Sequence, residues 1–297
     1  MTIQIFLQQV ANGISIGSLY SLIAIGYTMV YGILRLINFA HGDIFMMAAY
    51  FMVFSMINFS LPWYISTIIV IVVTIALGVL IEKIAYKPLR DAPRMSIMIS
   101  AIGMSFLLEN LAVYLFTGVP KGFPDIEILT KSISFGNISL SVVTVITPIV
   151  TLIMLIFVLF ITNKTKIGMA MRAVSKDYET ARLMGININK VISTTFVIGS
   201  GLAAIGAILW GSKYPSVIPL MGVMPGLKCF IAAVLGGIGN TTGAVLGGFI
   251  LGMSEIMLVS FLPSLTGYRD AIAFIILIVV LLVKPTGLLG EKVTDKV

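Results

Sequence analysis

Five polar or ionisable side chains in otherwise apolar surroundings are the residues from which chemistry could come in this chain. Glu109 and Glu255 each interrupt a long apolar run, and Asn38, His41 and Asp43 lie together in the stretch INFAHGD. A carboxylate inside a membrane is costly, so it usually faces protein or water and pairs with a partner or marks an ion or substrate pathway. Cross-helix pairing and contact with a transported substrate are both open for the two glutamates.

The INFAHGD stretch, residues 37–43, joins two apolar segments and has two interpretations. One is a wet interfacial turn in which Asp43 favours the start of the next helix through the helix dipole. The other is a gate or coupling element near the inner membrane surface. Because His41 is the only histidine, neither a histidine metal cluster nor a Ser-His-Asp hydrolase site is expected. No span carries a nucleophile beside a base at helical spacing, so we predict no catalytic residue, no metal and no cofactor.

The composition predicts the kind of fold that must position these residues. Hydrophobic residues make up 59% of the chain and charged residues 10%, against about 25% charged residues in soluble proteins. Such a chain needs lipid as its solvent. We predict one all-α, polytopic membrane domain over residues 1–297, with about eight or nine transmembrane segments. The net charge of +7 does not indicate nucleic acid binding, because the basic residues lie at span ends, where they encode orientation.

Apolar runs bounded by turn and charge signals predict the individual helices. Their ranges are 13–34, 41–59, 62–82, 95–117, 139–161, 191–211, 226–238, 241–262 and 267–283. The Asn12-Gly13 pair leaves open a separate interfacial or partly inserted helix over residues 1–12. The side of the membrane on which the N-terminus lies is open for the same reason.

The distribution of Lys and Arg predicts which loops face the cytoplasm. The loops 83–94 and 162–190 and the tail after residue 283 are basic, which places them and the C-terminus in the cytoplasm of a cell inner (plasma) membrane protein. The loop 118–138 has few basic residues and is punctuated by proline and glycine, and the loop 214–226 is proline-rich. Both are expected on the outer side.

The stretch from Ile167 to Lys190 is the only long polar run in the chain. It contains Arg172, Lys176, Asp177, Glu179, Arg182 and Lys190. The pattern predicts a short helix over Asp177–Leu183 that is terminated by Gly185. A polar run between apolar spans is typical of a surface for a partner protein.

Glycines recur every four residues in LGGIGNTTGAVLGGFILG, residues 235–252. Gly239, Gly243 and Gly247 give this segment a flat face on which another helix backbone can pack closely. A phosphate-binding loop is excluded, because no Gly-Lys-Ser or Gly-Lys-Thr occurs in the chain. The Asn240-Thr241-Thr242 stretch either breaks the segment into two half-helices beside a pathway or forms a plain turn between two spans.

Three stretches together resemble the permease subunits of branched-chain amino-acid ABC transporters, of the LivH type. They are NGISIGSLYSLIAIGYTMVYGILRLINFAHGDIFMMAAY (12–50), GMAMRAVSKDYETARLMGIN (168–187) and AVLGGIGNTTGAVLGGFILG (233–252). The resemblance implies inward movement of branched-chain or similar amino acids, with ATP hydrolysed on separate ATP-binding cassette subunits. It also implies a second, related permease chain and a substrate-binding protein that docks on the outer loops 118–138 and 214–225.

The resemblance further implies that residues 162–190 hold the coupling segment that docks on the ATPase. The matching positions are Arg172, Asp177, Ala181 and Gly185, and the small side chain of Ala181 is expected at the docking contact. Import of urea, short amides or other amino acids is an alternative. A stand-alone secondary transporter, with Glu109 and Glu255 as its coupling-ion site, is another.

Overall fold

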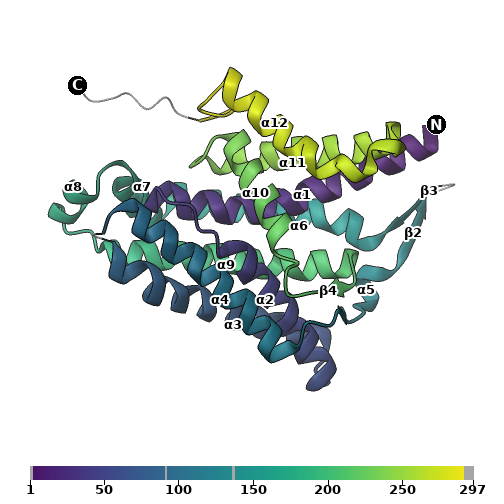
Figure 1. The fold of residues 1–297 in the computed structure, drawn as a ribbon, viewed down its shortest axis with the longest axis horizontal. Helices are drawn as coiled ribbons and strands as arrows, with labels where there is room; N and C mark the ends of the chain where they lie inside the picture. The colour runs from purple at the N-terminus through teal and green to yellow at the C-terminus, as the bar shows by residue number, and fades with distance from the viewer. Residues whose placement is uncertain (1–2, 91, 136–137, 291–297) are drawn as a thin grey trace.

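The computed structural model describes residues 3–90, 92–135 and 138–290. Asp91 and the predicted cytoplasmic lysines Lys292 and Lys296 lie outside these residues. The described chain is a bundle of helices that run roughly along the long axis of the molecule (Figure 1). The predicted all-α membrane fold is therefore confirmed.

Each of the nine predicted ranges contains a helix. Among the described residues, seven helical segments are long and apolar enough to cross a membrane. They are α1 (Ile3–Leu34), α3 (Trp63–Ile81), α4 (Arg94–Phe116), α6 (Val142–Lys164), α9 (Ile188–Lys213), α11 (Thr241–Phe261) and α12 (Arg269–Val283), which follows the 3-10 turn η4 (Pro263–Tyr268). The other two are shorter: α2 (His41–Val53), which continues as the π-helical turn η1 (Phe54–Asn58), and α10 (Val223–Gly236). The turns η2 (Glu82–Tyr86) and η3 (Lys87–Leu89) extend α3.

Helix α1 is the central helix of the bundle. It runs without a break from Ile3 to Leu34, so the separate helix considered over residues 1–12 is not formed. The helix continues through Gly13, where a Cβ atom would lie 2.9 Å from the Met253 sulfur of α11, so glycine here permits the two helices to pack closely. Most residues from Gly13 to Val30 are buried by α6, α9, α10 and α11.

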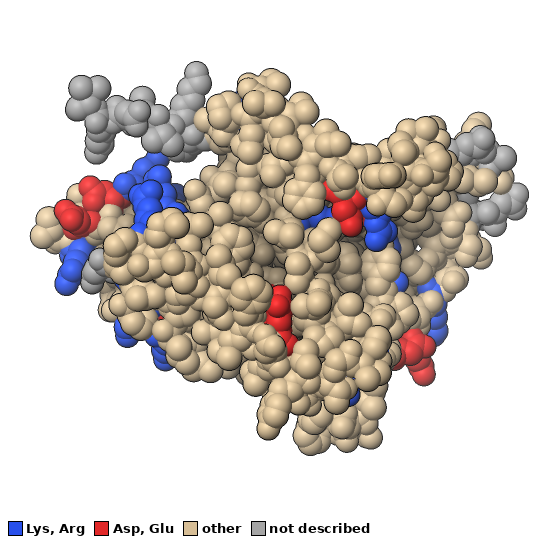
Figure 2. All heavy atoms as spheres, in the orientation of Figure 1, with Lys and Arg blue, Asp and Glu red and all other residues tan. Residues whose placement is uncertain are grey.

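The two ends of the bundle differ in structure and charge. The polar run forms α7 (Lys166–Lys176) and α8 (Tyr178–Leu183) at one end, and Figure 2 shows Lys and Arg gathered there. The opposite end holds the start of α1, α5 (Glu127–Thr130) and two small antiparallel sheets. β1 (Lys121–Gly122) pairs with β4 (Ser216–Val217), and β2 (Ser132–Phe135) pairs with β3 (Ile138–Ser141).

The last described residues lie at the same end as α8. The backbone N–H groups of Leu288 and Leu289 donate to the carbonyl oxygens of Leu235 and Gly236 at the end of α10. The turn that follows α10 lies beside Gly32, near the end of α1. The tail up to residue 290 and the polar run thus share one end of the molecule.

Candidate functional site

The polar run is shaped by two helix caps and one glycine. The Thr165 hydroxyl accepts a hydrogen bond of 3.1 Å from the Gly168 N–H in the first turn of α7. The Asp177 carboxylate accepts from two backbone N–H groups in the first turn of α8, at 2.9 and 3.1 Å. Gly185 has φ +80°, which suits glycine and ends α8. The short helix and its terminator lie where the sequence places them.

Three hydrogen bonds tie this segment to the ends of α1 and α6. The Tyr178 hydroxyl donates to the carbonyl oxygen of Ile33 at 2.9 Å, and the Arg35 guanidinium donates to the carbonyl oxygen of Ser175 at 2.9 Å. The Arg172 guanidinium donates to the last turn of α6. Burial raises the pKa of the Tyr178 phenol, with Arg90 and Arg35 acting in the opposite direction. The phenol therefore stays a donor, and α8 is fastened to the central helix.

The side chains that α8 exposes are not those expected from the sequence. Ala181 is only 3% exposed, so its side chain packs within its own chain rather than on a docking contact. The large apolar side chains exposed at the end of this segment are those of Leu183 and Met184, which are 87% and 78% exposed. The sequence of so short a helix does not show which of its sides packs against its own subunit.

A second polar cluster joins the extension of α3 to the start of α9. Glu82 is fully buried and accepts from the Arg90 guanidinium and from the Ser193 hydroxyl, the latter at 2.9 Å. Arg90 also donates to the side chain of Asn189. This cluster holds the start of α9, the helix that follows the polar run, against the extension of α3.

Asn38, His41 and Asp43 are all buried, so the wet interfacial turn is not what forms. The Asn38 side-chain oxygen accepts a hydrogen bond of 2.7 Å from the Tyr86 hydroxyl. The His41 ring lies edge-on to the Tyr27 ring, with 4.6 Å between the ring centroids. His41 also lies beside Gly26 and Gly199. Gly26 is about two turns before the end of α1, so the chain turns back into the bundle and α2 begins inside it.

The starts of α2 and α10 meet inside the protein. A Cβ atom on Gly42 would lie 2.6 Å from the carbonyl oxygen of Gly222 and 3.2 Å from the Cα atom of Gly226. Only glycine permits backbones to approach this closely. The two shorter helices, α2 and α10, therefore begin against each other inside the protein.

Asp43 and Glu109 lie on facing elements. The Ser105 hydroxyl of α4 donates to the Asp43 carboxylate, and Glu109 is one turn further along α4. Glu109 is half-buried, and its neighbour Asn110 is exposed on the outer face of α4. Asp43 is thus satisfied within the chain, whereas Glu109 and Asn110 lie at or near its surface.

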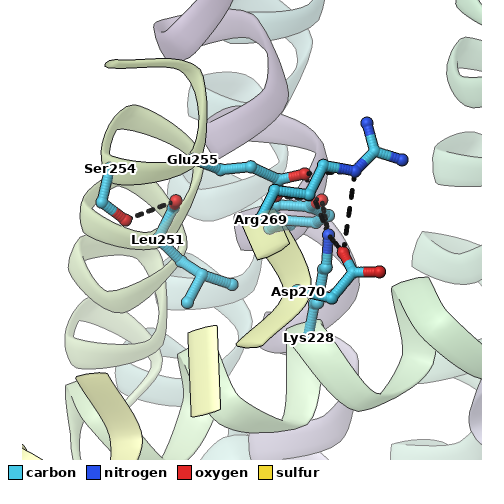
Figure 3. A network of polar contacts seen from close by, with 7 residues as sticks. Lys228, Leu251, Ser254, Glu255, Arg269 and Asp270 are labelled. Atoms are coloured by element: carbon cyan, nitrogen blue, oxygen red, sulfur yellow. Dashed lines mark hydrogen bonds and ion pairs between the residues drawn. The ribbon is translucent and has the colours of Figure 1, made fainter. Parts of the chain in front are cut away.

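Glu255 belongs to an ion-pair network between α10, α11 and α12, which we call the Lys228 network (Figure 3). Its Lys228 and Glu255 are buried, whereas the side chains of Arg269 and Asp270 are 54% and 39% exposed. The Lys228 ammonium lies 2.9 Å from the Glu255 carboxylate and 2.6 Å from the Asp270 carboxylate. The Tyr20 hydroxyl donates to Glu255 at 2.8 Å, and Arg269 lies 3.6 Å from Glu255. Lys228 and Glu255 are 4% and 7% exposed. The pairing offsets the cost of holding these charges in the membrane.

The sequence prediction named Glu255 and missed its partner. Lys228 is the one basic residue in the apolar run GLKCFIAAVLGG, and an intramembrane lysine calls for an acidic partner as strongly as an intramembrane glutamate calls for a basic one. Pairing Lys228 with Glu255 from the sequence would have predicted that α10 and α11 are neighbours.

The glycines of α11 lie on two packed faces. A Cβ atom on Gly243 or Gly247 would overlap backbone carbonyl oxygens of α10, and a Cβ atom on Gly248 or Gly252 would overlap the backbone of α1. Gly239 is not part of either face, because it lies in the turn before α11 with φ +94°. The Asn240 side chain caps α11, so the stretch forms a plain turn and not a broken span.

Comparison with known proteins gives one family. The family model described as the permease component of branched-chain amino acid transport systems matches residues 9–281. The high-affinity branched-chain amino acid transport system permease protein LivH of Salmonella typhimurium is 43% identical, over 98% of both chains. LivH of Escherichia coli is 42% identical and BraD of Pseudomonas aeruginosa 40%, each over 98% of both chains.

A solved structure shares the fold. PsaBC from Streptococcus pneumoniae, determined in complex with Fab, matches with a TM-score of 0.50 and 15% identity. The match covers 93% of this chain and 91% of that one.

Proposed function

Because the chain belongs to the family of permease components of branched-chain amino acid transport systems, we propose that it is the membrane-spanning permease subunit of an ATP-driven importer of branched-chain or similar amino acids. The cargo of its relatives supports this cargo class. In this proposal ATP is hydrolysed on separate ATP-binding cassette subunits, and the lack of a phosphate-binding loop motif in the sequence agrees with that division.

The observation that carries the proposal is the exposed tip of α8. Leu183 and Met184, at the end of α8, are largely exposed. Helix α8 lies at the basic end of the bundle (Figures 1 and 2), where the positive-inside rule places the cytoplasm. Met169 of α7 is exposed as well, and a patch of exposed large apolar side chains is typical of a surface that binds a partner protein. We assign them to the contact with the ATPase subunit.

The bonds around α8 explain how a movement of the ATPase would reach the membrane. Tyr178 links α8 to the end of α1, and the Glu82 cluster links α9 to α3. A displacement of α8 therefore moves the central helix and not only a loop. Transport then follows from ATPase states that bind the inward- and outward-facing permease with different affinity.

The opposite end is suited to a substrate-binding protein. The β1–β4 pairing joins the loop 118–138 to the loop 214–225, so the two predicted outer loops form one surface. The starts of α2 and α10 are closely packed and leave no open pathway between them within this chain. We therefore assign the other half of the pathway to a second, related permease chain.

This assignment makes a prediction about sidedness. Single cysteines in place of Glu179 in α8 and Val119 in the opposite loop, both exposed, should react with an impermeant thiol reagent from opposite sides of the membrane. Glu179→Cys should be labelled only in inside-out vesicles and Val119→Cys only in intact cells. The native Cys229 is buried and should give no background. Labelling of position 179 in intact cells would reverse the topology, including the cytoplasmic C-terminus.

Uptake by the reconstituted complex tests the function. Proteoliposomes holding this permease with its co-purified subunits should accumulate leucine, isoleucine or valine only with ATP and the binding protein, and urea or acetamide should not compete. Competition by urea or acetamide would assign the alternative cargo. Uptake by this chain alone, driven by an ion gradient without ATP, would instead establish a secondary transporter and remove the role given to α8.

A further inference from the structure

The first turn of α12 carries more charge than the Lys228 network needs. Lys228 is already paired with Glu255 at 2.9 Å, yet it also lies 2.6 Å from the Asp270 carboxylate. Arg269 and Asp270 reach the surface, and exposed ion pairs contribute only about 0–1 kcal/mol to folding. Ionisable side chains in membrane segments that are not fully enclosed by protein typically face water and mark a pathway for a ligand.

Arg269 and Asp270 have bonding groups that the network leaves free. A guanidinium carries five N–H donors, and in the described part of the chain only the Nε atom of Arg269 lies near acidic groups, 3.6 Å from Glu255 and 3.7 Å from Asp270. Figure 3 shows the two terminal nitrogens of Arg269 pointing away from both carboxylates. The Oδ1 atom of Asp270 is buried beside Lys228, whereas the other oxygen points away from the lysine. A two-pronged donor and a free carboxylate oxygen therefore lie next to each other.

An aromatic wall adjoins these charges. The centroid of the Trp210 ring lies 5.0 Å from that of Tyr214 and 6.1 Å from that of Tyr20. The Tyr20 hydroxyl donates to Glu255, which joins the wall to the network. Burial and the Glu255 carboxylate raise the pKa of the Tyr214 phenol, and Arg269 lowers it, so both charges act on this ring. Tyr214 is 39% exposed, which leaves ring surface accessible beside the charges.

The position of this group fits the outer side of the membrane. Tyr214 follows the end of α9 and begins the loop 214–225, which β4 joins to the other predicted outer loop. Helix α12 begins at Arg269 and leads to the tail, whose last described residues lie at the α8 end. The start of α12 is therefore directed toward the side on which a binding protein would release cargo.

We propose that Arg269, Asp270 and Tyr214, here called the α12 site, bind the transported amino acid as a zwitterion on the outer side of the membrane, an inference that rests on the function proposed above. The guanidinium donates two parallel hydrogen bonds to the α-carboxylate, and the free Asp270 oxygen accepts from the α-ammonium. The aliphatic side chain packs on the aromatic wall. The network holds two basic and two acidic groups, so a ligand without net charge suits it. Lys228 is a positioning residue that holds Asp270.

Ligand analogues test zwitterion recognition in the unmodified complex. The permease is purified with its ATPase subunits but without the binding protein, and leucine binding is followed by saturation-transfer NMR, which detects weak ligands in rapid exchange. Isoleucine and valine should compete with leucine. Isoamylamine, which lacks the carboxylate, and isocaproate, which lacks the ammonium, should each compete about ten-fold less well or worse. Competition by either analogue as strong as that by valine would overturn the proposal.

Two substitutions assign the contacts to residues. Arg269→Gln should weaken leucine binding by about ten-fold or more and leave the binding of isoamylamine unchanged. Asp270→Asn should weaken leucine binding similarly and leave the binding of isocaproate unchanged. The matched control is Arg94→Gln, which removes an exposed arginine from the start of another spanning helix, α4, and should bind leucine normally. If either variant of the α12 site fails to fold, the analogue series on the unmodified protein decides.

The outcomes separate this inference from the function on which it rests. If the complete importer takes up leucine with ATP but the complex without binding protein gives no leucine signal, the α12 site does not bind cargo while the importer stands. The same conclusion follows if both substitutions leave leucine binding unchanged. A phosphatidylethanolamine headgroup also carries an oxyanion and an ammonium; its co-purification with the unmodified protein but not with Arg269→Gln, without a leucine signal, would assign the site to lipid. Failure of the complete importer to take up leucine would refute the proposed function itself.

Discussion

Replacing Leu183 and Met184 together by aspartate should abolish ATP-driven uptake while the permease remains inserted at its normal level. Both side chains are largely exposed, so the change costs the isolated chain little. At an interface, each buried apolar side chain contributes about 1.5–3 kcal/mol. Loss of two should weaken ATPase association by about 100-fold or more. Uptake into vesicles and co-purification of the ATPase measure the two effects.

Two further variants make this result specific. Exchanging the two residues, as Leu183→Met with Met184→Leu, conserves volume and should keep most of the uptake. Ala181→Trp should instead lower the amount of folded permease, because this side chain is packed inside its own subunit. If the double aspartate variant transports normally, the tip of α8 does not contact the ATPase.

Replacing Lys228 by methionine should strongly destabilise the permease. The change leaves the Glu255 carboxylate buried without its ammonium partner at 2.9 Å, and breaking one side of a buried ion pair costs about 3–5 kcal/mol. The purified protein should lose a large part of its thermal stability in detergent. Unfolding temperature, followed by tryptophan fluorescence, measures the loss.

A second substitution should recover much of that stability. Lys228→Met combined with Glu255→Gln removes both charges and leaves an amide that can still accept from Tyr20, so the double variant should be more stable than the single one. The matched control is Lys213→Met, which breaks one bond of 2.8 Å to the Ser15 hydroxyl and no ion pair; its effect should be near 1 kcal/mol. A double variant no more stable than Lys228→Met would show that charge pairing does not hold α10, α11 and α12 together.

The positions of the helices could be predicted from sequence, because crossing a membrane requires long apolar runs bounded by polar residues. For the same reason α9 and α11 begin within a few residues of their predicted starts. Helix terminators are also local, so the short helix after Asp177 and its end at Gly185 could be predicted from neighbouring residues alone.

The side of each helix that faces protein could not be predicted. Lipid tails are as apolar as leucine, so a buried face and a lipid face have the same composition. The depth of His41, the inward side chain of Ala181 and the pairing of Lys228 with Glu255 all depend on which helices are neighbours. That information lies in contacts between residues far apart in the sequence.

The central position of α1 has a consequence for how the protein is made. Val245 of α11, which covers Ser21, follows it by 224 positions, so at ribosomal speeds of 5–20 residues per second α1 waits roughly 10–45 s for this neighbour. During that time the side of α1 that α11 will cover faces lipid, although α6 and α9 are made earlier and cover other sides of it. The hydroxyls of Ser18 and Ser21 each donate at 2.7 Å to a carbonyl oxygen one turn earlier in α1, so both are satisfied before any other helix arrives. In the folded protein the single Ser21 hydroxyl proton is shared between the carbonyl oxygens of Gly17 and Val245, at 2.7 and 2.8 Å. The polar side chains of Ser18 and Ser21 therefore do not prevent α1 from being inserted in the bilayer before α11 packs against it.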